Sequence, residues 1–260
     1  MKEYTLWEGS GATKIEWYEP KCKKSDMAVL IFPGGGYIKL VDYEGKDYAE
    51  YINEQGITAF VVYYRHKPDY FPLPLLDARR AVRFVRENAN MFGIDVNKIA
   101  VMGSSAGGHL CALLSTYMDK IEGEGIDKID NIDFLPNAQI LCYPVISANE
   151  SISHKDSYMR LLGEEYINKE KYSPELLVTE KTPMAFIWHT AEDKTVSVEN
   201  SLRYVAALTQ KGVLCELHVF PHGKHGLALS LDDAHVACWK SLLENWLQLN
   251  GWLENCKKCN

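Results

Sequence analysis

Residues 99–107 are Ile99-Ala100-Val101-Met102-Gly103-Ser104-Ser105-Ala106-Gly107. The apolar run at 99–102 predicts a buried strand, and the apolar stretch 110–117 predicts a helix directly after the turn. A Gly-x-Ser-x-Gly motif between a strand and a helix indicates a nucleophile elbow, in which the serine stands on a sharp turn above the sheet edge. We therefore predict that Ser105 is a nucleophile. Gly103 and Gly107 let strand and helix approach closely, since they carry no Cβ atom.

A plain helix start is the alternative explanation of this turn, with Ser104 or Ser105 as the N-cap residue. A cap alone does not call for glycine on both sides of the serines, so the elbow is the preferred interpretation. Ser104 occupies the variable position of the motif, which makes it the weaker candidate nucleophile. We expect its side chain to contact the substrate instead.

Strand and helix patterns alternate along the rest of the chain. Apolar runs without polar alternation predict strands covered on both faces, and apolar residues at helical spacing predict helices between them. This order predicts one α/β domain over residues 1–260, with a mostly parallel sheet and helices on both faces. The predicted strands are 27–32, 57–64, 99–102, 138–145, 183–188 and 214–220, and the predicted helices are 43–54, 75–89, 110–117, 198–211 and 234–249.

Two segments interrupt the alternation, residues 119–137 and 147–182. We predict that both are short lid or cap insertions over the carboxyl ends of the strands, where ligands bind in open α/β sheets. Aromatic residues near or inside the second segment either form a platform for a sugar or pack in the interior. They are Tyr143, Tyr158, Tyr166 and Tyr172.

A glycine-rich turn, Pro33-Gly34-Gly35-Gly36-Tyr37, ends the first predicted strand. Acyl transfer places negative charge on the carbonyl oxygen, and losing one backbone N–H donor to that oxygen typically costs about 10²–10³ in rate. We predict that the donors of this oxyanion hole are Gly35, Gly36 and Ala106, and that Tyr37 contacts the substrate. An ordinary turn is the alternative. A phosphate loop would require Gly-Lys-Ser/Thr, which is absent here.

Two histidines follow the last predicted strand, in Phe220-Pro221-His222-Gly223-Lys224-His225-Gly226. A serine hydroxyl is a weak nucleophile until a base accepts its proton. His225 lies farther from the strand end, between glycine-bearing turns, and is the predicted base. His222 is the second candidate.

An acidic residue is expected one strand earlier, to hold the base in the correct tautomer and to stabilise its charged form. Asp193 lies in the loop after the strand predicted at 183–188 and is the preferred candidate. Glu192 is the second candidate, and the alternative is that the acid is only a solvated loop carboxylate without a catalytic role. The order Ser105, Asp193, His225 is the chain order expected of an α/β-hydrolase.

At this point the sequence resembles a known family, the small acetyl-xylan-esterase-like sugar esterases of the α/β-hydrolase superfamily, close to the hormone-sensitive-lipase branch. The resemblance rests on four motifs between residue 27 and the final helix. Two departures from the lipase branch, Pro33 where it has His and Ser104 where it has Asp, favour the sugar esterases. The motifs are Pro33-Gly34-Gly35-Gly36-Tyr37, Leu75-Leu76-Asp77-Ala78, Gly103-Ser104-Ser105-Ala106-Gly107-Gly108-His109 and His222-Gly223-Lys224-His225-Gly226.

The resemblance implies an α/β-hydrolase fold and a serine carboxylesterase that removes small acyl groups, above all acetyl, from sugars or oligosaccharides. Asp77 is a family-typical position that we expect to be structural. An amidase such as an aryl-formamidase, or a small peptidase, uses the same catalytic groups and stays open. A hydrolase scaffold that only binds is a third hypothesis, disfavoured because every catalytic part has a candidate residue.

Composition and charge narrow the class of partner. The 260 residues are 47% hydrophobic and 24% charged, which suits a globular protein with a large core. A net charge of −7 argues against nucleic acid. The start of the chain is not typical of a secretory signal, and no stretch approaches the roughly 18 apolar residues of a membrane span. We therefore expect a cytoplasmic protein that acts on a small-molecule ester, and the sequence leaves a homo-oligomer open.

No cofactor or metal is expected. The histidines show no His-x-x-x-His pair, and His109, one turn beyond Ser105, is expected to be structural. Cys256 and Cys259 form a Cys-x-x-Cys at the end of the chain, but a zinc site needs four ligands and no second pair lies nearby in sequence. We interpret these two cysteines as reduced thiols of a frayed tail.

Overall fold

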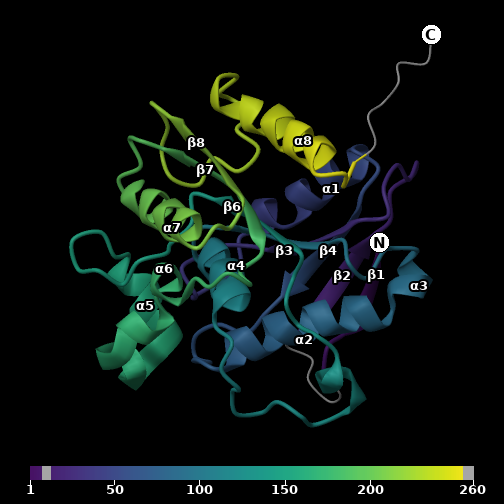
Figure 1. Cartoon of the computed structure of the whole chain (residues 1–260), viewed down its shortest axis with the longest axis horizontal. Coiled ribbons are helices and arrows are strands. Elements are labelled where there is room, and N and C mark those ends of the chain that lie inside the picture. Colours follow the sequence, from purple (N-terminus) through teal and green to yellow (C-terminus); the bar gives the residue numbers. More distant parts are fainter. Residues whose placement is uncertain (8–12, 254–260) are drawn as a thin grey trace.

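A computed structural model describes residues 1–7 and 13–253 of the chain. Its centre is an eight-stranded sheet in the order β1-β2-β4-β3-β5-β6-β7-β8 (Figure 1). Strands β3 to β8 run parallel to one another, which confirms the mostly parallel sheet. The strands are β1 (Lys2–Thr5), β2 (Lys14–Tyr18), β3 (Ala28–Phe32), β4 (Thr58–Tyr63), β5 (Ile99–Ser104), β6 (Ala138–Cys142), β7 (Met184–Thr190) and β8 (Cys215–Phe220).

Strands β1 and β2 were not expected from the sequence. They pair antiparallel to each other, and β2 pairs antiparallel to β4, with Trp17 opposite Phe60. β1 has four residues and is largely exposed, so it lacks the apolar run by which the inner strands are found. Its place in the sheet depends on pairing with β2, which no local pattern reveals.

Two layers of helices cover the sheet (Figure 1). One face packs against α2, α4 and α7, and the other packs against α1 and α8. The predicted helices on both faces are therefore present. The α-helices are α1 (Lys46–Glu54), α2 (Leu73–Glu87), α3 (Ala89–Phe92), α4 (Ala106–Thr116), α5 (Lys155–Leu162), α6 (Pro174–Leu177), α7 (Glu199–Gln210) and α8 (Trp239–Leu249), and the 3-10 helices are η1 (Asp42–Glu44), η2 (Lys128–Asn131), η3 (Gly163–Tyr172) and η4 (Val236–Cys238).

The strand predicted at 138–145 ends earlier, at Cys142. Tyr143 has a positive φ of 38°, which an extended strand does not allow, and Pro144 follows it. The early end turns the chain across the carboxyl edge of the sheet. This turn brings residues 143–146 next to the elbow, where the N–H of Val145 donates to the carbonyl of Ser105 over 3.0 Å.

The segment 119–137 lies along α2, and its prediction as a lid over the strand ends is wrong. Arg79 donates to the carbonyl of Asp119, Arg80 binds Asp127, and Arg86 donates to the carbonyl of Leu135. Successive turns of α2 therefore hold successive parts of the segment. The physical reason is charge: the segment carries carboxylates that pair with the arginines of this helix.

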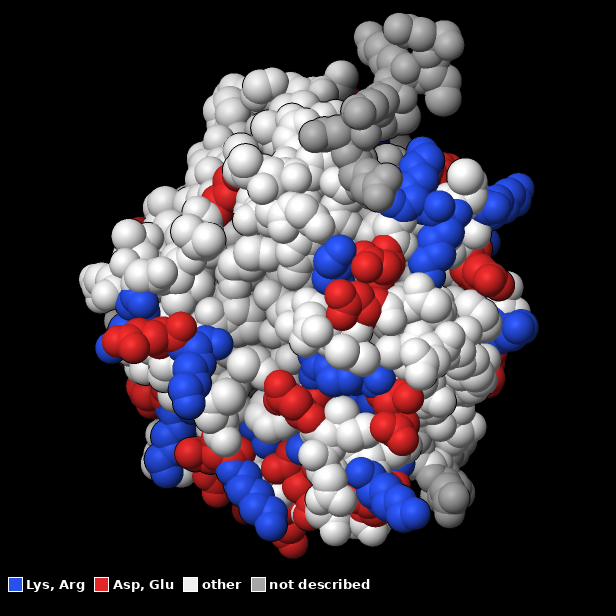
Figure 2. Space-filling view, turned by 45° about the vertical axis from the view of Figure 1, so that its right-hand side comes forward, with Lys and Arg blue, Asp and Glu red and all other residues white. Residues whose placement is uncertain are grey.

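Charged side chains of both signs lie interleaved on the lower half of the face that Figure 2 presents. Neighbouring opposite charges weaken each other's field, so the described residues form no continuous basic surface on this lower half. No helix within residues 1–7 and 13–253 is both long and apolar enough to cross a membrane. Cys256 and Cys259 lie outside the described residues.

Candidate active site

Ser105 stands alone between a strand and a helix, because β5 ends at Ser104 and α4 begins at Ala106. Its φ of 53° is uncommon for a residue with a side chain and forms the sharp turn expected of an elbow. A Cβ atom on Gly103 would lie 2.3 Å from the carbonyl oxygen of Gly107, and one on Gly107 would lie 2.0 Å from that of Phe32. Both positions therefore require glycine, as the motif predicts.

The backbone of the turn is fixed on both sides. The N–H of Ser105 donates to the carbonyl of Cys142 over 3.0 Å, and the carbonyl of Ser105 accepts from His109 and Val145. The residue is 8% exposed, so its neighbours cover most of it. These contacts hold the Ser105 oxygen in one place above the carboxyl edge of the sheet.

His225 reaches this oxygen from the loop after β8. Its Nε2 lies 2.8 Å from Ser105 Oγ, and its Nδ1 lies 2.6 Å from Asp193 Oδ2. The Nδ1 atom therefore carries a proton that it donates to the carboxylate, and Nε2 is free to accept the serine proton. The structure brings together the three residues that the sequence analysis proposed as nucleophile, base and acid.

Asp193 is held by four donors. Its Oδ1 accepts from the N–H groups of Thr195 and Val196, both at 2.9 Å, and its Oδ2 lies 3.3 Å from His189 Nε2. Burial would raise the pKa of Asp193, but the hydrogen bonds from His189 and His225 outweigh it and bring that pKa well below its ordinary value. The carboxylate is therefore ionised at neutral pH.

The second candidates lie elsewhere. His222 Nδ1 is 3.0 Å from Glu192 Oε1, and both side chains are more than half exposed. The two residues thus form a surface pair with each other. Ser104 is fully buried, and its hydroxyl donates to the Tyr48 hydroxyl over 3.0 Å. None of these three side chains contacts Ser105 Oγ among the described hydrogen bonds.

The glycine turn after β3 lies against the elbow. Gly35 and Gly36 have φ values of +129° and +63°, and a Cβ atom on Gly35 would lie 2.2 Å from the carbonyl oxygen of Lys39. In the described part of the chain, the N–H groups of Gly35 and Gly36 have no hydrogen-bond acceptor. The N–H of Ala106 begins α4 and so lacks an acceptor within the helix. The N–H of Gly34, by contrast, is bound by Glu44.

A groove of about 360 Å³ opens over these groups. The groove is lined by Gly35, Gly36, Ser105 and His225, and further lining side chains come from the segments 38–44 and 154–160. The segment 147–182 therefore borders the groove through His154 and Arg160. The additional lining residues are Ile38, Lys39, Val41, Tyr43, Glu44, His154, Arg160, Thr195 and Gly226.

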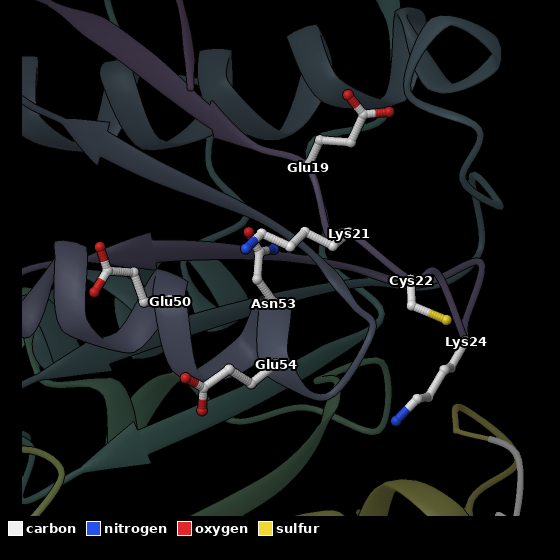
Figure 3. A pocket seen from close by; sticks show the side chains of 7 residues that line it. All are labelled: Glu19, Lys21, Cys22, Lys24, Glu50, Asn53 and Glu54. Carbon is white, nitrogen blue, oxygen red and sulfur yellow. The ribbon is translucent and has the colours of Figure 1, made fainter.

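A neighbouring hollow of about 390 Å³ shares Thr195 and His225 with this groove, and larger hollows lie elsewhere on the molecule. One of about 490 Å³ lies beside α1, and Figure 3 shows that its labelled side chains do not converge on a common point. Its Asn53 already donates to the carbonyls of Tyr18 and Ile57. No group of three or more His, Cys, Asp or Glu among the described residues could hold a metal ion.

Two expected substrate contacts are corrected. Tyr37 is 1% exposed, and its hydroxyl binds His109 Nδ1 at 2.9 Å in the interior. Ser104 is buried against Tyr48. Neither residue lines the groove. The sugar platform is corrected in the same way, since Tyr143, Tyr158 and Tyr172 are all less than a tenth exposed and pack in the core, with Tyr166 partly buried against it.

Sequence reasoning missed four residues beside the reacting groups: Glu44, His154, Arg160 and His189. His189 and Glu44 are buried and come from segments without a catalytic motif. His154 and Arg160 lie in the second insertion, whose position over the groove gives no indication of which side chains face it. Only the fold brings these residues to the elbow.

Two proteins of similar sequence cover most of this chain. The chain is 38% identical over 216 residues to endo-1,4-beta-xylanase B of Butyrivibrio fibrisolvens, covering 79% of this chain and 33% of the xylanase. It is 33% identical over 255 residues to an acetylxylan esterase of Xylanibacter ruminicola, covering 95% of this chain and 50% of the esterase. The chain thus spans only a third to a half of these relatives.

Solved structures of similar size match the whole fold. An acetyl ester-xyloside bifunctional hydrolase from Caldicellulosiruptor lactoaceticus superposes with a TM-score of 0.90 at 38% identity, covering 97% of both chains. An α/β-hydrolase enzyme from a Medee basin deep-sea metagenome library superposes with a TM-score of 0.75 at 31% identity, covering 95% of this chain and 96% of that one. A model of the BD-FAE family matches residues 15–208. The chain has the α/β-hydrolase fold and belongs to the BD-FAE family.

Proposed function

We propose that this chain is a serine carboxylesterase that hydrolyses small acyl esters, above all acetyl esters of sugars or oligosaccharides. The observation that carries the proposal is the line of contacts at the elbow, with Ser105 Oγ 2.8 Å from His225 Nε2 and His225 Nδ1 2.6 Å from Asp193. A serine, an imidazole and a carboxylate at such distances are the arrangement of acyl-transfer hydrolases.

In the first half of the reaction, Ser105 Oγ attacks the ester carbonyl carbon while His225 Nε2 accepts the serine proton. The carbonyl π electrons move to the oxygen, which then faces the N–H groups of Gly35, Gly36 and Ala106. Asp193 stabilises the imidazolium that has formed. When the carbonyl re-forms, the bond to the alcohol oxygen breaks, and His225 gives the proton to the leaving alcohol.

In the second half, water replaces the alcohol. His225 Nε2 accepts a proton from the water as its oxygen attacks the acyl-serine ester. The tetrahedral intermediate collapses, the bond to Ser105 Oγ breaks, and the imidazolium returns the proton to that oxygen. The products are the free carboxylic acid, which ionises at neutral pH, and the regenerated serine.

The choice of an acetylated sugar rests on the relatives and on the groove. An acetylxylan esterase and an acetyl ester-xyloside hydrolase are among the similar proteins. The groove is open and has polar rim residues, Lys39, His154 and Arg160, which suits an alcohol portion rich in hydroxyl groups.

The direct test is hydrolysis of p-nitrophenyl acetate by the wild type, Ser105→Ala and Ser115→Ala. Ser115 lies on α4 and donates only to the carbonyl of Cys111 in its own helix. We expect Ser105→Ala to abolish turnover and labelling by a fluorophosphonate probe, and Ser115→Ala to keep both. Equal rates for the wild type and Ser105→Ala would refute the proposal.

A substrate panel tests the acyl and alcohol portions. Acetylated xylo-oligosaccharides, longer-chain aryl esters and an N-formyl aryl amide are compared by kcat/KM. We expect the acetylated oligosaccharides and short aryl esters to be turned over fastest. A preference for the amide would move the chain to the amidases, which share the same groups.

A further inference from the structure

Glu44 is a buried carboxylate beside the reacting groups that the proposed mechanism does not use. It is 3% exposed and lines the groove together with Ser105 and His225. Within residues 1–7 and 13–253, no Lys or Arg forms an ion pair with it. A buried charge without a cationic partner is costly, so its environment must supply other stabilising contacts.

Both oxygens of Glu44 accept a hydrogen bond. Oε2 accepts from the N–H of Gly34 over 2.8 Å, and Oε1 accepts from the hydroxyl of Tyr143 over 2.7 Å. A Cβ atom on Gly34 would lie 2.6 Å from Glu44 Oε2 and 3.2 Å from Ser105 Cβ. Gly34 therefore lies between Glu44 and Ser105, and its hydrogen bond to Glu44 fixes the position of the glycine turn.

Tyr143 extends this contact to the loop that carries the base. Its hydroxyl accepts from the N–H of Ala228 over 3.0 Å, and its ring centroid lies 5.0 Å from that of His225 in an edge-on arrangement. Its own N–H is bound to the carbonyl of Trp188. Tyr143 also holds a φ of 38°, which places its side chain under the site.

These bonds form one chain of contacts, from Gly34 through Glu44 and Tyr143 to Ala228. These contacts join the turn that contains Gly35 and Gly36 to the loop that contains His225. The N–H donors must face the carbonyl oxygen while the base faces the attacking and leaving oxygens on the same carbon, and errors of less than about 1 Å matter there. Burial raises the pKa of Glu44, whereas Tyr143, Gly34 and the charge of His225 favour its ionised form.

We propose that Glu44 and Tyr143 are positioning residues, which set the distance between the oxyanion turn and the His225 loop. This inference rests on the proposed hydrolysis at Ser105. The two residues are expected to stabilise the transition state, because only there do the oxyanion turn and the base both act on oxygens bonded to one tetrahedral carbon. Glu44 lines the groove, but both its oxygens are hydrogen-bonded to Gly34 and Tyr143, so we expect ground-state binding of the ester to change little in the variants.

Two near-isosteric variants test the proposal. Glu44→Gln presents an amide that can accept from only one of the two donors, and Tyr143→Phe removes the hydroxyl that joins Glu44 to Ala228. One matched control is Glu16→Gln on β2, which alters a buried carboxylate bound by the hydroxyls of Tyr18 and Tyr63. The other is Tyr204→Phe, which removes a buried hydroxyl bound to Gln139.

We expect each single variant to lower kcat for p-nitrophenyl acetate by about tenfold, with KM within about twofold of the wild type. The inhibition constant of phenylboronic acid, which forms a tetrahedral adduct with serine, should rise by a similar factor. The double variant should lose about as much as the worse single one, since both break one chain of contacts. The control variants should keep wild-type kcat.

The proposal is overturned if both variants keep kcat within about twofold of the wild type, if only KM changes, or if the two losses multiply in the double variant. Circular dichroism and the thermal midpoint show whether each variant is folded, and Tyr143→Phe carries the test if Glu44→Gln does not fold. A wild type that neither hydrolyses the ester nor takes up the fluorophosphonate refutes the proposed function, and this inference with it. An active wild type with unaffected variants refutes the inference alone.

Discussion

Two histidines three residues apart have very different surroundings. His225 is bonded to Ser105 and Asp193 and is largely buried, whereas His222 faces Glu192 with most of its side chain in solvent. The two residues share the same loop and similar sequence neighbours. Their difference in role therefore comes from which imidazole the loop turns toward the elbow.

We predict that His225→Gln lowers kcat by at least about 10⁴, because the serine then lacks a base. His222→Gln should stay within about twofold of the wild type, since a surface pair contributes little. Steady-state hydrolysis of p-nitrophenyl acetate measures both variants. Similar losses in the two variants would contradict the assignment of the base.

His109 is buried and neutral. Its Nδ1 contacts the Tyr37 hydroxyl at 2.9 Å, and its Nε2 contacts the carbonyl of Tyr172 at 3.0 Å. A carbonyl only accepts, so Nε2 carries the proton and Nδ1 accepts from Tyr37. Burial lowers the pKa of His109 to about 4 from its ordinary 6.5. This agrees with the structural role expected for it.

This shift predicts a loss of stability in acid. Below about pH 6.5 the unfolded chain binds a proton at His109, whereas the folded chain does not bind it until about pH 4. The free energy of unfolding therefore falls as the pH drops through this window. Between pH 7.5 and pH 5 the contribution is about 2 kcal/mol. Urea unfolding of wild type and His109→Gln at both pH values should show a smaller pH-dependent loss in the variant. Equal losses would contradict the prediction.

The arginines of helix α2 bind partners that the sequence pattern of the helix does not predict. Its arginines lie off the apolar stripe and would be expected in solvent. Instead Arg79, Arg80 and Arg83 are buried beneath the segment 119–137. Arg79 donates to the carbonyls of Tyr117 and Asp119 and pairs with Glu124, so the segment is fastened to the polar side of the helix.

We predict that Arg79→Ala destabilises the protein by about 1–3 kcal/mol, because the carbonyls of Tyr117 and Asp119 lose a donor and Glu124 keeps Arg83 but loses its second guanidinium. Arg203→Ala, which removes a surface pair with Glu199 at 3.8 Å, should cost less than about 1 kcal/mol. Urea unfolding measures both. Because the segment lies away from the groove, kcat and KM of folded Arg79→Ala should match the wild type, and a changed KM would contradict the placement along α2.

At the scale of the molecule, the sheet is what assembles the site. The glycine turn, the elbow, the Asp193 loop and the His225 loop follow four different strands, β3, β5, β7 and β8. Parallel strands present all their carboxyl ends at one edge, so the four loops meet there. The site loops are also tied to each other, as when Thr190 donates to the carbonyl of Gly223.

We predict that the site and the fold are lost together. Fluorophosphonate labelling requires Ser105 and His225, which lie 120 positions apart, to be in contact. Labelling should therefore fall along the same urea transition as tryptophan fluorescence, which reports the stacked pair Trp188 and Trp239 in the core. Labelling lost at clearly lower urea would mean that the site loops open before the sheet does.

Local patterns were sufficient for much of this protein. The inner strands, the helices between them and the elbow at Ser105 could be predicted, because a buried strand and a glycine-flanked turn constrain nearby residues directly. The fold class follows from their alternation, and the candidate residues Asp193 and His225 follow from their chain order. Each of these inferences concerns residues within one element or one loop.

Features that depend on contacts between distant segments could not be predicted. The pairing of β1 with β2, the course of 119–137 along α2 and the burial of Tyr37 and Ser104 all depend on partners 9 to 72 positions away. The same holds for Glu44, whose neighbours Gly34 and Tyr143 come from two other loops. A side chain's surroundings are set by which segments the sheet brings together, and no single stretch of sequence contains that information.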